Sequence, residues 1–341
     1  MTTKPKVTVA GAGALGLSCA LALADAGFAV TVCDPGPPLG NASAVAGGMI
    51  APSFEAVLDP EATAHFDLLL AARDLWPALE ARSGASLDRT GALAAGRPEW
   101  LQQLATRLAD LGLHATEIPR HAAEELAPGL SGEFGSALLN REDWRLDPRA
   151  ALQALTAAAK AAGVAFRPEA VRERGDADLL VLATGAAAEF AALAPETAVL
   201  APIKGHILRT PTPDLCSVTV RGEGVYVTPA DAGLAIGATM EPGVGDPRPD
   251  PAKAGPLLAA GARLFPALAD AVPELQAGVR AATPDGLPLV GFSQAPGVLL
   301  ASGARRNGWL IAPLVAQVTA ALAAGRDPGR FAARFDPARF S

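Results

Sequence analysis

The sequence predicts an α/β fold, α+β overall, in which a parallel sheet is assembled from separated segments and a second domain with an antiparallel sheet is inserted between them. The first observation is a βαβ pattern, where apolar strands at Lys6–Ala10 and Val30–Cys33 flank a helical pattern over Ala14–Ala26. The second is a buried strand within Ala177–Gly185. The third is a change to strand periodicity between residues 203 and 240, which predicts an antiparallel meander.

The other elements follow from helical or strand spacing. Asp147 followed by Pro148 is typical of a helix start, which places a helix over Asp147–Ala162. A final helix, Leu310–Ala324, follows Asn307-Gly308. Further helices are predicted over Ala62–Arg82, Pro98–Leu111, Pro251–Arg263 and Pro266–Ala271, and a hairpin over Leu87–Ala95. The meander strands are Ile203–Arg209, Ser217–Arg221, Gly224–Pro229 and Gly233–Thr239, and later strands are Ala277–Ala281, Leu287–Gly291 and Gly297–Ser302.

Domain boundaries follow from grouping these elements. The strand at 178–183 and the C-terminal strand and helix belong with the first βαβ unit, so we predict one domain over residues 1–76, 143–200 and 280–341. The second domain is predicted over residues 77–142 and 201–279, around the meander.

Composition excludes several classes of function. Half of the 341 residues are hydrophobic and 18% are charged, which is typical of a well-buried globular protein. The formal net charge of −7 argues against a nucleic-acid partner. The N-terminus enters the first strand within a few residues, so we expect a cytoplasmic protein without a signal peptide or membrane span. The four histidines and the cysteines Cys19, Cys33 and Cys216 lack metal-ligand spacing, and we predict no metal site.

A glycine motif carries the main functional signal. Gly11, Gly13 and Gly16 form a G-x-G-x-x-G pattern between the first strand and helix, and Asp34 closes the next strand. Gly11 permits the tight turn, Gly13 allows backbone N–H groups to approach a pyrophosphate, and Gly16 allows close helix–strand packing. The helix N-terminus favours phosphates, and Asp34 is placed to accept from a ribose hydroxyl. The sequence therefore predicts a dinucleotide site in a Rossmann-like domain.

Two other small-residue segments are expected to contact that nucleotide. The run Ala42–Pro52 contains adjacent glycines, Gly47 and Gly48, which indicates backbone pressed against something flat or bulky. Thr184-Gly185, after the buried strand, is suited to a second backbone contact.

These motifs together resemble the D-amino-acid oxidase superfamily of FAD-dependent oxidoreductases over nearly the whole chain. The resemblance rests on the fingerprint, the Ala42–Pro52 run, Ala183–Gly185, Arg280–Gly291 and Arg306–Pro313. Within the superfamily, Pro202–Gly205, Gly237–Gly243 and Arg306–Gly308 are most similar to the glycine-oxidase branch that serves thiamine biosynthesis.

The resemblance implies an FAD-dependent oxidase of glycine or another small amino acid, which yields an oxo acid, ammonia and hydrogen peroxide. No cysteine follows Cys216, so the FAD is expected to be non-covalent. The chain departs from the glycine-oxidase pattern at Ala281, where a proline is usual, and at Ala304-Arg305, where a histidine and an aromatic residue are usual. Alternatives are a D-amino-acid dehydrogenase, a sarcosine or secondary-amine oxidase, and a non-catalytic nucleotide-binding protein. A homo-oligomer is suggested by resemblance alone.

The resemblance also assigns roles at the active site. Arg280 is expected to clamp the substrate carboxylate, because a planar guanidinium donates two parallel hydrogen bonds. Tyr226, the only tyrosine, is expected to donate to the same carboxylate. Met240 is expected either to line the pocket or to fill the core, and the backbone carbonyls of Arg306-Asn307-Gly308 are expected to accept from the substrate amine. Asp285 is interpreted as a turn former, and His206 is given no acid–base role. Cofactor contacts are expected from Gly11, Gly13, Ala14, Leu15, Gly16, Asp34, Ser43, Gly47, Gly48, Met49, Thr184, Gly185, Gly303, Arg306, Asn307, Gly308, Trp309 and Leu310.

Overall fold

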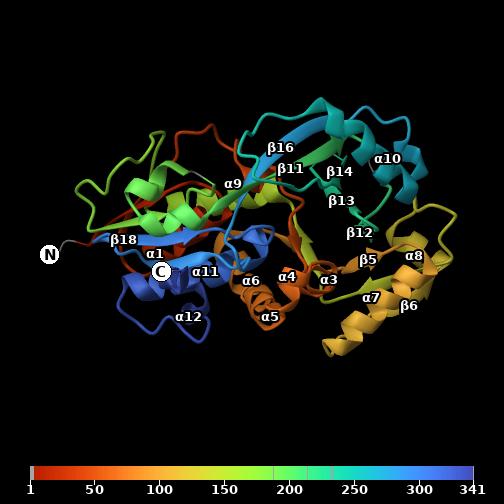
Figure 1. Ribbon diagram of the computed structural model, residues 1–341, viewed down its shortest axis with the longest axis horizontal. Helices are drawn as coiled ribbons and strands as arrows, with labels where there is room; N and C mark the ends of the chain where they lie inside the picture. The colour runs from red at the N-terminus through yellow and green to blue at the C-terminus, as the bar shows by residue number, and fades with distance from the viewer. Residues whose placement is uncertain (1–3, 187, 213, 232, 341) are drawn as a thin grey trace.

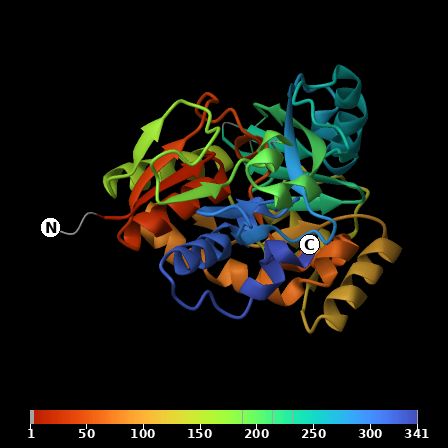
Figure 2. The ribbon, with the colours of Figure 1, turned by 60° about the vertical axis from the view of Figure 1, so that its left-hand side comes forward.

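The computed structural model describes residues 4–186, 188–212, 214–231 and 233–340 of the protein. The chain folds into two halves that lie side by side along the long axis, each built around a large sheet (Figure 1). The view turned by 60° shows the N-terminal strands and the 201–282 region still on opposite sides of the molecule (Figure 2).

The first large sheet has the strand order β17, β18, β10, β1, β2, β9. Neighbouring strands are parallel except for the β17–β18 pair. Three separated segments therefore form one largely parallel sheet, which confirms the predicted assembly. Its strands are β1 (Lys6–Ala10), β2 (Ala29–Cys33), β9 (Ala165–Arg167), β10 (Leu179–Leu182), β17 (Leu289–Phe292) and β18 (Val298–Ser302).

Both faces of this sheet are buried, as expected for a parallel sheet. Val9 and Val181 belong to the core formed with three helices, α1 (Ala14–Asp25), α9 (Pro148–Ala161) and α11 (Gly308–Ala323). Leu180 and Leu182 alternate to the other face and pack with Phe190. β10 and β18 are buried at every position because helices or loops cover both faces of the sheet there.

The second large sheet contains the predicted meander, which is confirmed as antiparallel. Its strand order is β15, β11, β14, β13, β12, β5, β7, β6, with β16 paired to the free side of β11 and only β12–β5 parallel. The strands are β5 (Ala92–Ala94), β6 (Thr116–Pro119), β7 (Ser136–Asn140), β11 (Ala201–Thr210), β12 (Thr219–Gly222), β13 (Val225–Ala230), β14 (Gly233–Gly237), β15 (Glu241–Pro242) and β16 (Glu274–Ala282).

The two faces of this sheet have different roles. Val220, Val227, Ile236 and Leu208 lie opposite one another across four strands and pack under α10 (Ala254–Leu264). The neighbouring row, which points to the other face, consists of Arg221, Tyr226, Gly237 and Ile207. This second row faces the functional site described below.

A three-stranded sheet and several short helices fill the space between the halves. The strands β3 (Met49–Ile50), β8 (Trp144–Leu146) and β4 (Leu87–Asp88) pair in that order. The remaining α-helices are α2 (Ala42–Val45), α3 (Pro52–Leu58), α4 (Pro60–Thr63), α5 (Phe66–Asp74), α6 (Trp76–Ser83), α7 (Pro98–Asp110), α8 (Arg120–Leu126) and α12 (Ala332–Phe335). Single 3₁₀ turns occur at Ala188–Ala192, Pro195–Val199, Pro251–Lys253, Pro266–Leu268 and Pro337–Phe340.

Two sequence predictions were wrong in this central region. The single helix expected over 62–82 is divided into α4, α5 and α6, and Pro77 cannot supply the N–H that would continue α5 into α6. The hairpin expected at 87–95 is not formed, because β4 pairs with β8 whereas β5 pairs with β7 and β12. Gly91, at φ +106°, redirects the chain between those two sheets.

The domain boundaries stay a prediction. β4, from the predicted 77–142 segment, shares a sheet with β8 from the 143–200 segment. Within the described residues, no helix is both long and apolar enough to cross a membrane.

We predict that Asp147→Ala lowers the free energy of unfolding by about 1–2 kcal/mol, because this carboxylate caps α9. One of its oxygens accepts from the Ala150 N–H at 2.8 Å, and the other accepts from the Asp231 N–H at 2.9 Å. Urea unfolding followed by circular dichroism measures the change. Asp147→Asn, which keeps an acceptor for the cap, should lose less than half as much; equal losses would contradict a capping role.

Candidate active site

Two adjoining cavities lie where the parallel sheet meets the inner face of the second sheet. The glycine cavity, of about 240 Å³, is lined by Gly11, Gly13, Gly185 and Gly303 together with Asp34. The arginine cavity, of about 290 Å³, is lined by Arg221, Arg280 and Arg306 together with Glu55 and Tyr226. The two cavities adjoin, because four residues line both of them: Ala46, Arg280, Arg306 and Trp309.

The glycine cavity is shaped by the turn between β1 and α1. A Cβ on Gly11, which has φ +106°, would lie 2.4 Å from the Ala183 carbonyl oxygen, so only glycine fits there. Asp34 lines the cavity, and its two oxygens accept from the N–H groups of Ala12 at 2.7 Å and Gly36 at 2.8 Å. The Ser43 hydroxyl accepts from the Ala14 N–H at 3.0 Å.

This arrangement fits an extended nucleotide. The cavity contacts a carboxylate at one end, passes the N-terminus of α1, and reaches Arg280 and the N-terminus of α11 at the other. The unpaired N–H groups of a helix N-terminus favour a phosphate or a developing negative charge. Trp309 holds the start of α11 in place, because its Nε1 donates to the Ser43 carbonyl oxygen at 3.0 Å.

The structure brings most of the predicted cofactor residues to these cavities. Those lining the glycine cavity are Gly11, Gly13, Ala14, Leu15, Asp34, Ser43, Thr184, Gly185, Gly303, Arg306, Gly308 and Trp309. Gly47, Gly48, Met49 and Asn307 line the arginine cavity instead. Gly16 and Leu310 line neither cavity. A Cβ on Gly16 would lie 2.0 Å from the Gly11 carbonyl oxygen, so Gly16 serves close packing, and the Leu310 side chain is buried in the core.

Tyr226 fits between two glycines. A Cβ on Gly47 would lie 2.8 Å from its hydroxyl oxygen, and one on Gly237 would lie 2.2 Å from it. The bulky group expected against Gly47 is therefore this phenol. Its hydroxyl makes no hydrogen bond within the described parts of the chain, and it lines the arginine cavity. Burial raises the pKa of Tyr226, although Arg280 and Arg221 oppose the shift, so the hydroxyl remains a hydrogen-bond donor.

Arg280 is a half-buried cation that lines both cavities. Its guanidinium occupies the space above Gly205, where a Cβ would lie 2.1 Å from Nη1. The Thr239 carbonyl oxygen, at 3.5 Å, is a distant acceptor, and no carboxylate of the described residues forms an ion pair with Arg280. Burial lowers the pKa of Arg280, yet an arginine stays protonated at neutral pH. The site therefore presents an unneutralised guanidinium.

Arg306 and Met240 meet on one side of the arginine cavity. Arg306 Nη1 donates to the Met240 sulfur at 3.8 Å, and Arg306 Nε lies 2.8 Å from Glu55 Oε1. Arg305, the next residue, pairs with Asp59 and with Glu61, whose Oε2 lies 3.0 Å from Nε. Asp59 Oδ2 also lies 3.6 Å from Arg306 Nη1. Among the described residues, Arg306 is thus already paired with carboxylates, whereas Arg280 is not.

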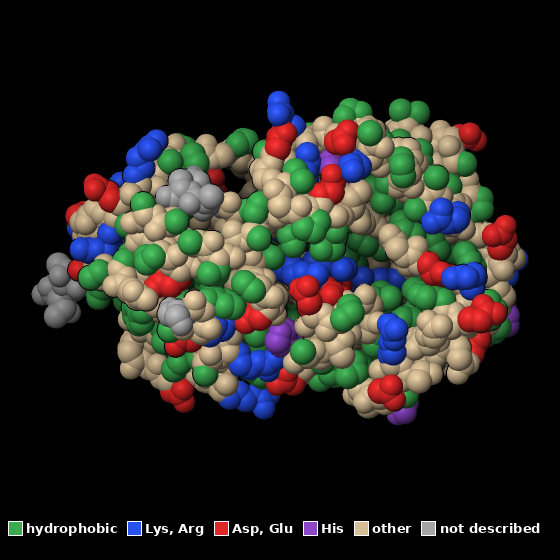
Figure 3. Space-filling model, in the orientation of Figure 1, with side chains coloured by type: hydrophobic (Ala, Val, Ile, Leu, Met, Phe, Trp, Pro, Cys, Tyr) green, Lys and Arg blue, Asp and Glu red, His purple; other side chains and the backbone are tan. Residues whose placement is uncertain are grey.

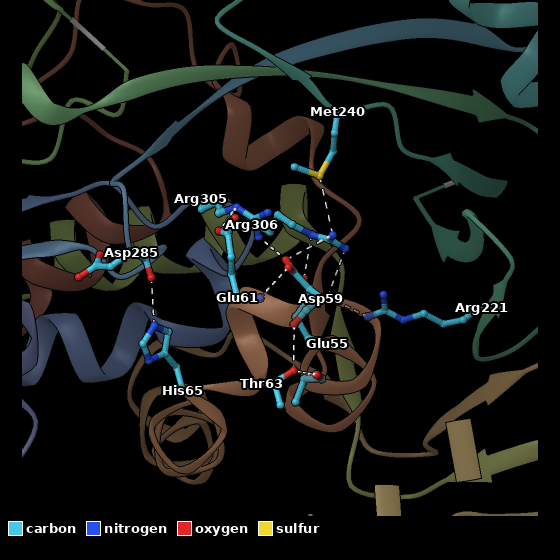
Figure 4. Close-up of polar contacts among 11 residues, drawn as sticks. Glu55, Asp59, Glu61, Thr63, His65, Arg221, Met240, Asp285, Arg305 and Arg306 are labelled. Carbon is cyan, nitrogen blue, oxygen red and sulfur yellow. Dashed lines mark hydrogen bonds and ion pairs between the residues drawn. The ribbon is translucent and has the colours of Figure 1, made fainter. Parts of the chain in front are cut away.

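Glu55 and Arg221 are site residues that the sequence analysis missed. Figure 4 shows the Glu55 carboxylate between Arg306 and Arg221, which approach it from different elements. Arg221 Nη2 lies 3.5 Å from Glu55 Oε2. Glu55 is held on α3 because the Asp143 carboxylate accepts from the N–H groups of Ser53 and Phe54. The available signal was a charged residue within apolar runs, at Phe54-Glu55-Ala56 and Val220-Arg221.

The space-filling view shows basic and acidic side chains gathered in the hollow between the two halves (Figure 3). The residues that could be suspected of acid–base roles lie elsewhere. Asp285 accepts from the Leu287 N–H at 3.1 Å and pairs with Arg339, as a turn former does. His206 is fully buried between Glu241 and the Asp250 N–H, and it lines neither cavity.

The cysteines also lie apart from the cavities. None of Cys19, Cys33 and Cys216 lines either one, and burial raises the pKa of Cys19 and of Cys216 to about 12. Thiols with such pKa values are poor nucleophiles.

Comparisons with known proteins agree with this geometry. A family model described as FAD dependent oxidoreductase matches residues 6–322. The glycine oxidase of Pseudomonas aeruginosa is 31% identical over 95% of this chain and 96% of its own length. A putative thiamine biosynthesis oxidoreductase, ThiO, of Rhizobium etli is 34% identical over 91% of this chain and 94% of its own length.

Two further matches are a longer relative and a solved structure. A bifunctional protein ThiO/ThiG of Trichormus variabilis is 30% identical over 92% of this chain, which spans about half (52%) of that relative. The crystal structure of glycine oxidase from Geobacillus kaustophilus matches with a TM-score of 0.81 and 27% identity, over 98% of each chain.

We predict that Glu55→Ala lowers the free energy of unfolding by about 3 kcal/mol, because it leaves two arginines of the cavity without their shared carboxylate. Denaturant unfolding of the wild type and the variant measures the difference. Glu61→Ala is the matched control: its carboxylate is 52% exposed, so its ion pair with Arg305 should contribute less than about 1 kcal/mol. Similar losses in both variants would contradict a special role for Glu55.

Proposed function

We propose that this chain, which belongs to the FAD-dependent oxidoreductase family, is an oxidase of glycine or another small amino acid with non-covalently bound FAD. The reaction converts the amino acid to an imine, which hydrolyses to an oxo acid and ammonia, and dioxygen becomes hydrogen peroxide. One observation carries the proposal. Among the described residues, Arg280 is a half-buried arginine without a carboxylate partner, and it stands beside Tyr226, a buried phenol without a hydrogen-bond partner, in a cavity that adjoins the glycine cavity.

The residues around the glycine cavity would hold the FAD. Asp34 would accept from the ribose, and the N–H groups at the start of α1 would bind the pyrophosphate. Gly308 and Trp309, at the N-terminus of α11, would bind the flavin end. When bound, FAD supplies the acceptor for the hydride that leaves the α-carbon of the substrate. The distance of all three cysteines from the cavities supports non-covalent binding.

The chain's own residues orient the substrate. Arg280 donates two hydrogen bonds to the carboxylate, and Tyr226 donates a third. Backbone carbonyls near Arg306 and Asn307 accept from the amine, while Met240 fills the adjacent wall. A neutral amine loses hydride without a side-chain base, and neither His206 nor Asp285 reaches the cavity.

Glycine oxidase and thiamine biosynthesis appear in the names of relatives that cover nearly the whole chain. These names support glycine as a substrate and thiamine biosynthesis as the pathway. An oxygen electrode with glycine, sarcosine, D-alanine and D-proline tests the reaction, with catalase to measure peroxide. Oxygen uptake with stoichiometric peroxide is expected. Flavin reduction without oxygen uptake would identify a dehydrogenase, and a flavin that no amine reduces would overturn the proposal.

We predict that Asp34→Ala weakens FAD binding by at least about tenfold, because the ribose and the Ala12 N–H both lose their acceptor. Titration of the apoprotein with FAD, followed by flavin fluorescence, measures the dissociation constant. Acid precipitation of the wild type should release all of the flavin. Asp25→Ala removes an exposed carboxylate from the same helix–strand unit and should leave the constant unchanged.

We predict that Arg280→Ala lowers kcat/KM by at least about a hundredfold, because the carboxylate loses its bidentate partner. Arg280→Lys should recover only part of the loss, since an ammonium lacks the planar fork. Tyr226→Phe removes one neutral donor and should cost about tenfold. Steady-state kinetics and the flavin absorption spectrum measure these effects. A near-normal kcat/KM in Arg280→Ala would show that the carboxylate binds elsewhere.

A further inference from the structure

Arg221 is the most deeply buried of the arginines that line the arginine cavity, and the function proposed above does not use it. The residue is 3% exposed and lines the cavity. Its Nε has no hydrogen-bond partner within the described residues, and its nearest acceptor, Glu55 Oε2, lies 3.5 Å away. A buried guanidinium with so few partners carries a large desolvation cost that a bound anion would offset.

The sheet directs Arg221 toward the substrate. Arg221 lies directly opposite Tyr226 in the β12–β13 pair, so both side chains point to the same face. Arg280 points to that face too. Gln276 on β16 is paired with Ile207, which lies in the same row of the sheet as Tyr226. Side chains alternate along a strand, so Arg280, four residues after Gln276, points to the same face as Gln276. The phenol therefore shares one face with two cations.

A substrate with one carboxylate would leave an excess of positive charge among the residues that line the arginine cavity. Three arginines and one carboxylate, Glu55, line it. Glu55 is paired most closely with Arg306, at 2.8 Å, and the substrate carboxylate would neutralise Arg280. The Asp143 carboxylate also interacts electrostatically with Arg221. Both of its oxygens, however, accept hydrogen bonds from backbone N–H groups of α3, and Asp143 does not line the cavity. Asp59 lies 3.6 Å from Arg306 but is paired with Arg305 as well, and it does not line the cavity. Among the described residues that line the cavity, Arg221 therefore has no carboxylate of its own and shares Glu55 with Arg306.

We propose that the preferred substrate is an amino acid with a second carboxylate, which Arg221 binds while Arg280 holds the carboxylate beside the reacting carbon. This inference rests on the proposed function and narrows its substrate class. A cavity of about 290 Å³ has room for such a side chain beyond the atoms of glycine.

The first test compares D-aspartate with D-asparagine, which have nearly the same shape and differ in side-chain charge. We expect kcat/KM to be at least about tenfold higher for D-aspartate, the effect of one charge-assisted hydrogen bond. Equal values for the two, or a preference for D-asparagine or glycine, would overturn the inference while leaving the amino-acid oxidase function intact.

The second test measures binding without turnover. Succinate should bind the holoenzyme at least about tenfold more tightly than succinamate, its monoamide, as measured by flavin difference spectra and by the shift in Tm. If no amino acid is oxidised but succinate still binds preferentially, the oxidase function fails while the second anion site stands. Equal binding of the two compounds would refute the site.

Variants then assign the effect to Arg221. Two ratios are compared: kcat/KM for D-aspartate over that for D-asparagine, and the affinity for succinate over that for succinamate. Both ratios should fall close to one in Arg221→Met, and Arg221→Lys should retain part of each preference. Arg145→Met removes a partly buried arginine that lines neither cavity, and both ratios should stay at the wild-type values. If Arg221→Met fails to fold, the Lys variant and the wild-type ratios still decide. Unchanged ratios in a folded Arg221→Met would show that Arg221 supports the cavity without selecting the ligand.

Discussion

The gathering of three arginines at one junction, largely shielded from water, is the constraint on which this structure depends. Arg221 and Arg280 come from β12 and β16 of the second large sheet, and Arg306 comes from the turn before α11 in the other half of the molecule. A guanidinium removed from water needs acceptors, and Glu55 supplies them to two of the three. One carboxylate on a short helix thus connects both halves of the molecule and leaves Arg280 available for a ligand.

Glycines create the space that these groups occupy. Gly47 and Gly237 enclose the Tyr226 ring, and Gly205 gives room to the Arg280 guanidinium. In each case a single Cβ would collide with the functional side chain. The shape of the site is therefore set by where side chains are absent as well as by the polar groups, and the same holds at Gly11 in the glycine cavity.

The agreement between sequence and structure varies with the range of the interactions. The first βαβ unit, the antiparallel meander and the Asp147 cap were predicted closely, because strand alternation, helix spacing and capping are local patterns. The division of 62–82 into three helices was not predicted, although the break between α5 and α6 has a local cause in Pro77. The separation of β4 from β5 was not predicted because partners distant in the sequence decide it. Most predicted cofactor residues line a cavity because they belong to a motif whose spacing reflects its geometry. Gly16 and Leu310 do not line a cavity, because Gly16 allows close packing against Gly11 and the Leu310 side chain lies in the hydrophobic core.

The sequence by itself determined the βαβ unit with its glycine turn and acidic strand end, and the meander, because each of these depends on residue types at short spacings. Arg280 and Tyr226 were identified as candidate ligands through the resemblance of their motifs to a known family. Only the tertiary structure decided that Glu55 and Arg221 join them, that Arg306 is already paired, and that Arg280 is not. The physical reason is that the free energy of a buried charge depends on its neighbours in space, and those neighbours lie up to 251 residues away along the chain.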